Sequence, residues 1–175
     1  MNTEVTFGRK CPDYSYVKRI VDKVLEDNSI IEPPISPKEI AQNSGIKVFF
    51  GTFPGDTSEI MGFYHIEGNS IYVNTDDAVN RQTFTIAHEL GHALLHKEII
   101  SSDPSRYKVL LRRPMGGEKD PLEQEANAFA ARLLVPRKFL DRYYKIATIE
   151  ELSRLFVVSE DVIRYRLKSE YKLGL

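Results

Sequence analysis

Cysteine and tryptophan are nearly absent from this chain of 175 residues, which has one cysteine, Cys11, and no tryptophan. A single cysteine forms no internal disulfide, which argues against a secreted, disulfide-stabilised domain. Residues 1–13 lack the apolar core of a signal peptide, and no apolar run is long enough to span a bilayer. We therefore expect a cytoplasmic protein that does not associate with a membrane.

An excess of charge of one sign is also missing, because 24 basic and 25 acidic residues give a formal net charge of −1. This balance argues against a protein dedicated to binding nucleic acid, although a local basic face remains compatible with it. Hydrophobic residues make up 42% of the chain and charged residues 28%, which is typical of a globular protein. The length is sufficient for one core with a small appendage.

What the chain does contain is the sequence HELGH, with His88 and His92 four positions apart. On an α-helix, residues at this spacing lie about 40° apart around the axis and roughly 6 Å apart along it. Their two imidazoles can therefore share one zinc ion. Gly91 lies within this predicted helix, which suggests that another backbone passes close by.

Glu89 follows the first histidine directly and lies about 100° further around the helix axis. Its carboxylate can reach a zinc-activated water without itself binding the metal. Zinc polarises a scissile carbonyl and lowers the pKa of its water to about 7, while Glu89 would carry the proton to the leaving amine. The chemistry that this pattern indicates is peptide hydrolysis. The alternative is a buried helix with two core histidines.

A zinc ion held by two histidines needs a third protein ligand. His96 lies one turn further along the same helix and cannot reach the same ion if the helix is straight. We interpret it as a core histidine or as one that supports a ligand from behind. The longer pattern HExxHxxGxxH requires glycine where this chain has Leu95. A ligand from a separate helix is the better hypothesis.

The segment DPLEQEANAFAARLLV, residues 120–135, is predicted to form that helix, with Asp120 as its N-cap. Projected at about 100° per residue, Glu123 lies on the flank of the apolar stripe with Asn127, whereas Glu125 falls toward the polar side. Glu123 is the better placed carboxylate, and Asn127 could form a hydrogen bond with a zinc-bound histidine. Alternatively, both acids serve only to complement the helix dipole.

Shorter patterns predict the other elements of the fold. Apolar periodicity predicts a helix over residues 14–27, and a second, short helix is predicted to end at Gly45. Residues rich in β-branched and aromatic side chains predict strands over 46–50, 59–66 and 70–74, the last two joined by a hairpin turn. We expect an α+β fold in which a small three-stranded antiparallel sheet packs on a helical bundle that contains the HExxH helix.

Two further helices are predicted near the C-terminus, with the sequences IEELSRLF and EDVIRYRLKSEY and with Thr148 and Ser159 as caps. Their apolar residues could form the core of a helix-turn-helix unit with basic residues on the second helix. Those basic residues are Arg164, Arg166 and Lys168. Val157 occupies the position where such turns often carry glycine, and residues 137–175 carry only nine basic against six acidic residues. DNA binding is therefore the less favoured role for this pair.

HELGHALLH, followed about thirty residues later by LEQEANAFAARLLVP, resembles the ImmA/IrrE family of metallo-endopeptidases. In that family, HELGH precedes a segment of the form ExxANxFAAxLLxP. The resemblance covers roughly residues 46–173, and two linked motifs in the right order are more specific than HExxH alone. Val135 stands where the family often has methionine, a hydrophobic exchange that does not threaten the chemistry.

The resemblance implies that His88, His92 and Glu123 bind Zn²⁺ and that Glu89 is the catalytic base. Characterised relatives cut helix-turn-helix transcriptional repressors, which relieves repression of mobile elements or stress-response genes. We therefore expect a zinc endopeptidase whose protein partner is a helix-turn-helix repressor. The alternative is a non-catalytic regulator, or a protein associated with a toxin–antitoxin pair, that binds a repressor or DNA.

We divide the chain into a zincin-like metallopeptidase domain, residues 1–145, and a helix-turn-helix-like C-terminal tail, residues 146–175, packed on it. Residues 97–119 are predicted to be a long loop, either a rim of the cleft or a solvated connection. No sequence feature identifies the group that stabilises the oxyanion. The candidates are Tyr64, His65, Tyr72 and Tyr107.

Overall fold

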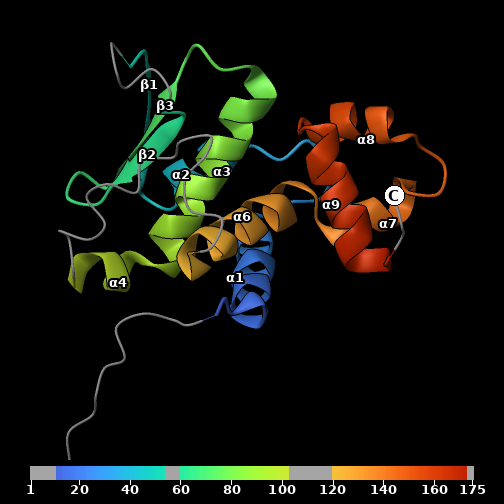
Figure 1. The fold of residues 1–175 in the computed structure, drawn as a ribbon, viewed down its shortest axis with the longest axis horizontal. Helices are drawn as coiled ribbons and strands as arrows, with labels where there is room; N and C mark the ends of the chain where they lie inside the picture. The colour runs from blue at the N-terminus through green and yellow to red at the C-terminus, as the bar shows by residue number, and fades with distance from the viewer. Residues whose placement is uncertain (1–10, 54–59, 103–119, 173–175) are drawn as a thin grey trace, which may run out of the picture.

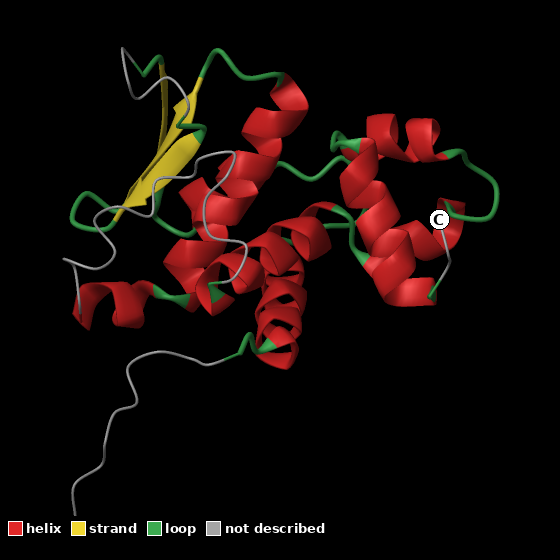
Figure 2. Ribbon diagram, viewed as in Figure 1, coloured by secondary structure: helices red, strands yellow, loops and turns green. Residues whose placement is uncertain are grey.

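The computed structural model describes residues 11–53, 60–102 and 120–172. The elements in these ranges are α1 (Tyr14–Asp27), α2 (Pro37–Asn43), β1 (Lys47–Gly51), β2 (Gly62–His65), β3 (Ser70–Asn74), α3 (Val79–Leu95), α4 (Lys97–Ser102), α6 (Pro121–Leu134), α7 (Arg137–Tyr143), α8 (Ile149–Phe156) and α9 (Glu160–Tyr171). The sheet lies at one end, α7 to α9 lie at the other, and α1, α3 and α6 lie between them (Figure 1). Helices predominate, as Figure 2 shows, and the predicted α+β class is confirmed. No helix in the described ranges is long and apolar enough to cross a membrane.

The sheet is mixed, and the prediction of a purely antiparallel sheet is wrong. Its strand order is β1-β3-β2, with β2 antiparallel and β1 parallel to the central β3. The hairpin between β2 and β3 is present as predicted, and the Tyr64 hydroxyl donates to Asn69 Oδ1 across it at 2.7 Å. Ten residues separate β1 from β2, far more than a tight hairpin needs, so β1 can reach the opposite edge of β3. The alternation of side chains along β1 does not distinguish parallel from antiparallel pairing with β3.

Helix α3 is the element around which the others pack. It contacts β2 and β3 on one side and α6 on another. The contact with α6 is close at Gly91, since an added Cβ would lie 3.1 Å from Phe129 Cδ1 and 3.3 Å from Ala126 Cα. A second backbone therefore does pass close to this glycine, which explains a residue that costs about 1 kcal/mol relative to alanine inside a helix.

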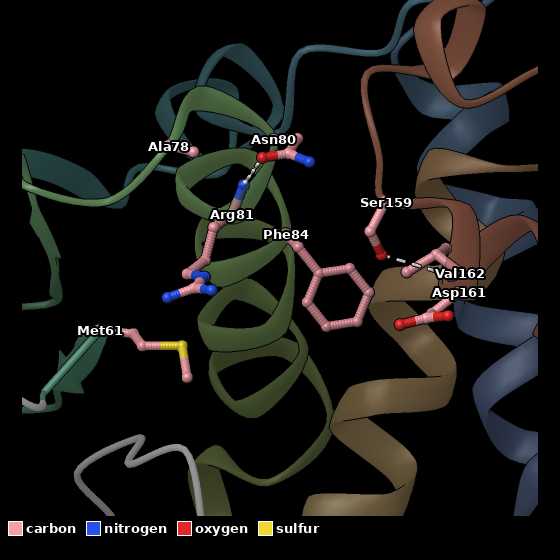
Figure 3. A pocket seen from close by; sticks show the side chains of 8 residues that line it. All are labelled: Met61, Ala78, Asn80, Arg81, Phe84, Ser159, Asp161 and Val162. Carbon is pink, nitrogen blue, oxygen red and sulfur yellow. Dashed lines mark hydrogen bonds between the residues drawn. The ribbon is translucent and has the colours of Figure 1, made fainter. Parts of the chain in front are cut away.

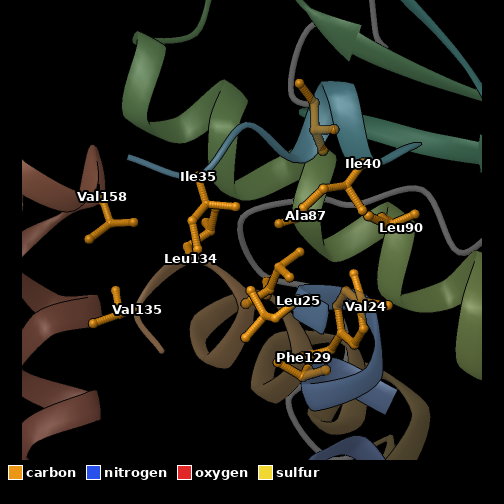
Figure 4. Close-up of a cluster of buried hydrophobic side chains, with 14 of the residues drawn as sticks. Val24, Leu25, Ile35, Ile40, Ala87, Leu90, Phe129, Leu134, Val135 and Val158 are labelled. Atoms are coloured by element: carbon orange, nitrogen blue, oxygen red, sulfur yellow. The ribbon is translucent and has the colours of Figure 1, made fainter. Parts of the chain in front are cut away.

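The hydrophobic core lies where α1, α2, α3 and α6 meet. Figure 4 shows Leu25 of α1, Ile40 of α2, Leu90 of α3 and Phe129 of α6 gathered in this cluster, and all four are buried. The cluster continues into the C-terminal helices, where Phe156 and other residues belong to it. The C-terminal helices thus share their apolar contacts with the rest of the chain. The division into two units after residue 145 stays a prediction.

The C-terminal helices α8 and α9 begin and end where the sequence predicts. The side chain of Thr148 accepts a hydrogen bond from the Glu151 amide, and that of Ser159 accepts one from the Val162 amide. Between the two helices, Val157 adopts a φ of 55°, the left-handed conformation that glycine adopts without strain. The position that often carries glycine in such turns is therefore left-handed here too, but with a β-branched residue.

Two predicted segments differ from the structure or lie partly outside it. Residues 97–119 begin with helix α4 rather than with a loop, and residues 103–119 lie outside the described ranges. The strand predicted over residues 59–66 is shorter, since β2 comprises Gly62–His65. Residues 54–59 also lie outside the described ranges.

Candidate metal centre

Helices α3 and α6 bring together three side chains that could hold a metal ion, and these are the predicted residues His88, His92 and Glu123. The two carboxylate oxygens of Glu123 lie 3.2 Å from His88 Nε2 and 3.0 Å from His92 Nε2. The two Nε2 atoms are 3.1 Å apart. A tetrahedral zinc ion with ligands at about 2 Å would place its ligand atoms about 3.3 Å from one another. The spacing therefore fits one small cation held by three ligands.

The three side chains are buried, with exposed fractions of 2% for His88, 4% for His92 and 12% for Glu123. Burial alone would raise the pKa of the Glu123 carboxyl. When the rings carry a proton on Nε2, His88 and His92 donate to this carboxylate, and these contacts outweigh burial and hold the pKa below its usual range. The ionised carboxylate is also the form that binds a metal.

The ring of His88 is oriented from behind by Asn127. His88 Nδ1 lies 3.0 Å from Asn127 Oδ1, so the predicted contact between Asn127 and a histidine of the cluster is present. An amide oxygen only accepts hydrogen bonds, so in this orientation of Asn127 a neutral His88 carries its proton on Nδ1 and presents the Nε2 lone pair toward Glu123. Two acceptor atoms 3.2 Å apart attract a cation between them. The donor set thus suits a metal ion.

Glu89 follows His88 on α3 and is only 1% exposed. A carboxylate so deeply buried is rare unless it has a partner or a function. Its place in the chain, next to a residue of the cluster, agrees with the position predicted for a general base. Its catalytic role remains a prediction.

Glu125 does not lie where the helical projection placed it. It is fully buried, with Oε2 2.8 Å from His96 Nε2 and Oε1 accepting from the Asp13 amide at 2.6 Å. The projection failed because α1 packs on the side of α6 that carries Glu125, whereas the exposed side of α6 carries Asn127. The signal that sequence reasoning missed is the set of small residues around the helix. These buried residues are Ala126, Ala128, Ala130 and Ala131.

His96 is also fully buried and joins Glu125 to the cluster, because its Nδ1 lies 3.0 Å from His92 Nδ1. The interpretation of His96 as a residue that supports a ligand from behind agrees with this placement. The sequence indicated that His96 could not reach the ion, but it did not indicate that Glu125 would be its partner.

Residues 41–168 match the family model described as the IrrE N-terminal-like domain, Peptidase M78. The chain belongs to the IrrE-like family of metallopeptidases. Uncharacterized immunity region protein 2 of Bacillus phage phi105 is 30% identical over 163 residues, which cover 91% of this chain and 94% of that protein. Metallopeptidase ImmA of Bacillus subtilis (strain 168) is 31% identical over 98 residues, 54% of each chain.

The family predicted from the two motifs is thereby confirmed. A solved structure, a Mycobacterium tuberculosis transcriptional regulator, matches this IrrE-like chain with a TM-score of 0.62 and 20% identity. The match covers 87% of this chain, and the chain spans only 55% of that regulator's length. At this identity, the match shows a shared fold.

The candidates for stabilising an oxyanion have other contacts in the described ranges. Tyr64 donates to Asn69 in the β2–β3 turn, and His65 Nδ1 accepts from the Gly68 amide in the same turn. The Tyr72 ring stacks between those of Phe49 and Phe63. Tyr107 lies outside the described ranges. The structure therefore favours none of the four.

A cavity of about 450 Å³ lies between the first turns of α3 and the start of α9 (Figure 3). Arg81 and Phe84 line it from α3, and Asp161 and Val162 line it from α9. None of the three metal-binding residues lines this cavity. It is thus separate from the metal centre, and we assign it no part in the chemistry.

Proposed function

We propose that this IrrE-like protein is a zinc-dependent endopeptidase that cleaves a helix-turn-helix transcriptional repressor and so relieves repression of a mobile element or a stress response. The observation that carries the proposal is the convergence of His88, His92 and Glu123. Glu89 follows His88 directly in the sequence. The names of two relatives, a metallopeptidase and a phage immunity region protein, support a peptidase that acts in a regulatory setting.

Each residue of the site has one task in this mechanism. When bound, zinc supplies a Lewis acid for the scissile carbonyl and makes a water molecule more acidic. His88, His92 and Glu123 would hold the ion. Glu89 takes the proton of the attacking water and delivers it to the leaving amine. Asn127 accepts a hydrogen bond from His88 and fixes the orientation of its ring.

The contacts of the C-terminal helices favour a protein substrate over DNA. Arg166, one of the three basic residues suggested for DNA contact, is 1% exposed and donates to the Val135 carbonyl and to Glu170. Arg164 is paired with Glu160 on the surface of the same helix. Arg164 and Arg166 of α9 are thus paired with acidic residues of the same chain. We propose that the tail formed by residues 146–175 helps to bind the substrate.

The test is cleavage of a helix-turn-helix repressor encoded beside the gene, by zinc-loaded wild type and by Glu89→Gln. We expect two repressor fragments with the wild type. Because positioned general bases contribute at least about 100-fold to rate, Glu89→Gln should cut at least about 100-fold more slowly while binding the same amount of zinc. Glu26→Gln makes the same chemical change at an exposed position of α1 and should leave the rate unchanged.

Cleavage by Glu89→Gln at the wild-type rate would contradict the role of Glu89. Failure of the wild type to cut any such repressor would contradict the proposed substrate. Normal derepression in cells by Glu89→Gln would favour the non-catalytic regulator instead.

A further inference from the structure

We propose that His96 and Glu125 form a hydrogen-bond relay that fixes which nitrogen of His92 faces the metal. The relay consists of the His92, His96 and Glu125 side chains and the Asp13 amide. It rests on the proposed metal site, and it makes His96 and Glu125 positioning residues rather than ligands. Nothing in the HExxH motif or in its relation to Glu123 requires them.

The relay is continuous, and its three side chains are buried. His92 Nδ1 lies 3.0 Å from His96 Nδ1, and His96 Nε2 lies 2.8 Å from Glu125 Oε2. His96 and Glu125 are fully buried, and His92 is 3% exposed. Water therefore has little access with which to replace any of these hydrogen bonds.

The direction of each hydrogen bond follows from the group at the far end. An ionised carboxylate only accepts hydrogen bonds, so the Glu125 contact requires the proton of His96 to be on Nε2. In a neutral imidazole, Nδ1 of His96 then carries a lone pair and accepts. His92 must therefore donate from Nδ1, which leaves its Nε2 lone pair pointing toward Glu123, 3.0 Å away. This is the tautomer that binds a metal through Nε2.

The Glu125 end of the relay is held in place by the start of α1. Glu125 Oε1 accepts from the Asp13 amide at 2.6 Å, and Asp13 is the N-cap of α1. The carboxylate thus receives a hydrogen bond on each oxygen, from α3 on one side and from the start of α1 on the other. Helices α1 and α6 also pack directly on each other. Glu125 therefore has little freedom to rotate away from His96.

The two histidines of the cluster are oriented by unequal means. His88 is supported by Asn127, an exposed amide that can rotate to present its NH₂ group instead of its oxygen. His92 is supported by a buried chain that ends in a carboxylate, which has no donor to present. The tautomer of His92 is therefore imposed more strictly than that of His88.

The relay can be tested by the zinc affinity of purified protein, measured by competition with a chelating dye. We expect His96→Phe, which keeps a ring but removes both nitrogens, to bind zinc about 10- to 100-fold more weakly, the usual effect of removing such a supporting group. Glu125→Gln should also weaken binding. His96→Asn keeps an acceptor close to the place of Nδ1 and should recover part of the loss.

The matched control is Glu170→Gln, which makes the same change as Glu125→Gln in the Arg166 network between α6 and α9. It should leave zinc affinity within about two-fold, because it touches neither histidine. A zinc affinity of His96→Phe equal to that of the wild type would overturn the relay. If the wild type binds no zinc at all, the proposed function fails instead.

Ring-nitrogen NMR of the wild type tests the relay without any substitution, and so covers the case in which the variants do not fold. In zinc-loaded protein we expect the His96 proton on Nε2 and the His92 proton on Nδ1. A His96 proton on Nδ1 would overturn the relay whatever the zinc affinity. The same spectrum of metal-free protein locates the His96 proton even if zinc does not bind.

Discussion

Two buried polar networks lie at opposite ends of α6, and they differ in how their donors and acceptors are paired. Between α3 and α6, His88, His92 and Glu123 direct acceptor atoms toward one point. Between α6 and α9, Arg166 donates to Glu170 at 2.7 Å and to the Val135 carbonyl at 3.0 Å, so donors meet acceptors. Burial costs free energy in both places. The second network is balanced by its own donors and acceptors, and a cation would balance the first.

The balance of donors and acceptors distinguishes a candidate site from a structural contact. Burial and ionisable groups are common to both networks, so neither property identifies the functional one. What differs is the balance of donors and acceptors. Burial lowers the pKa of the Arg166 guanidinium, and the adjacent Glu170 offsets part of that effect. Arg166 thus stays charged within a matched pair, and its network should govern stability but not metal binding.

Arg166→Met should break the matched network and strongly destabilise the folded protein. It removes the donor from the Val135 carbonyl and leaves Glu170, whose side chain is 10% exposed, without its shortest ion pair. We expect the free energy of unfolding to fall by about 3 kcal/mol, the lower end of the usual range for breaking a buried ion pair. The loss stays near this lower end because Glu170 keeps its contacts with Arg132 and Arg137. Urea unfolding of metal-free protein measures the change.

The double variant Arg166→Met/Glu170→Met is the control for that prediction, because it removes both charges and should recover most of the lost stability. Zinc affinity should stay within about two-fold of wild type in both variants, since the network does not touch the metal centre. A large loss of zinc affinity in the single variant would show that the two networks are coupled. It would contradict the conclusion that the Arg166 network governs stability alone.

Val157→Gly should have a smaller and opposite effect. Val157 holds a left-handed φ of 55° between α8 and α9, which costs a β-branched residue roughly 1 kcal/mol relative to glycine. Its side chain is only partly buried and lies outside the hydrophobic cluster, so little packing is lost. We expect the free energy of unfolding to rise by about 0.5 to 1 kcal/mol. A decrease of that size would show that Val157 packs better than its surroundings indicate.

Local patterns in the sequence predicted most of the helices because the information lies within each segment. The bounds of α1, α8 and α9 follow from apolar periodicity and from caps such as Thr148 and Ser159. The spacing of His88 and His92 likewise depends on one helix alone. A projection of the second helix then favoured Glu123, and the family resemblance implied the same residue.

The errors arose where the answer depends on packing between distant segments. The parallel pairing of β1 with β3 depends on the path of a ten-residue connection, which the strand sequences do not record. The burial of Glu125 depends on α1 covering a face of α6 that a single-helix projection treats as polar. Both are tertiary effects that override local preference.

The central claim is that His88, His92 and Glu123 bind one metal ion, and elemental analysis tests it most directly. Wild-type protein incubated with zinc and then dialysed should retain about one zinc per chain, as expected for one site with three protein ligands. Glu123→Ala should keep the wild-type circular dichroism spectrum but lose its zinc. Zinc retained at the wild-type level by Glu123→Ala, or no zinc in the wild type, would contradict the account.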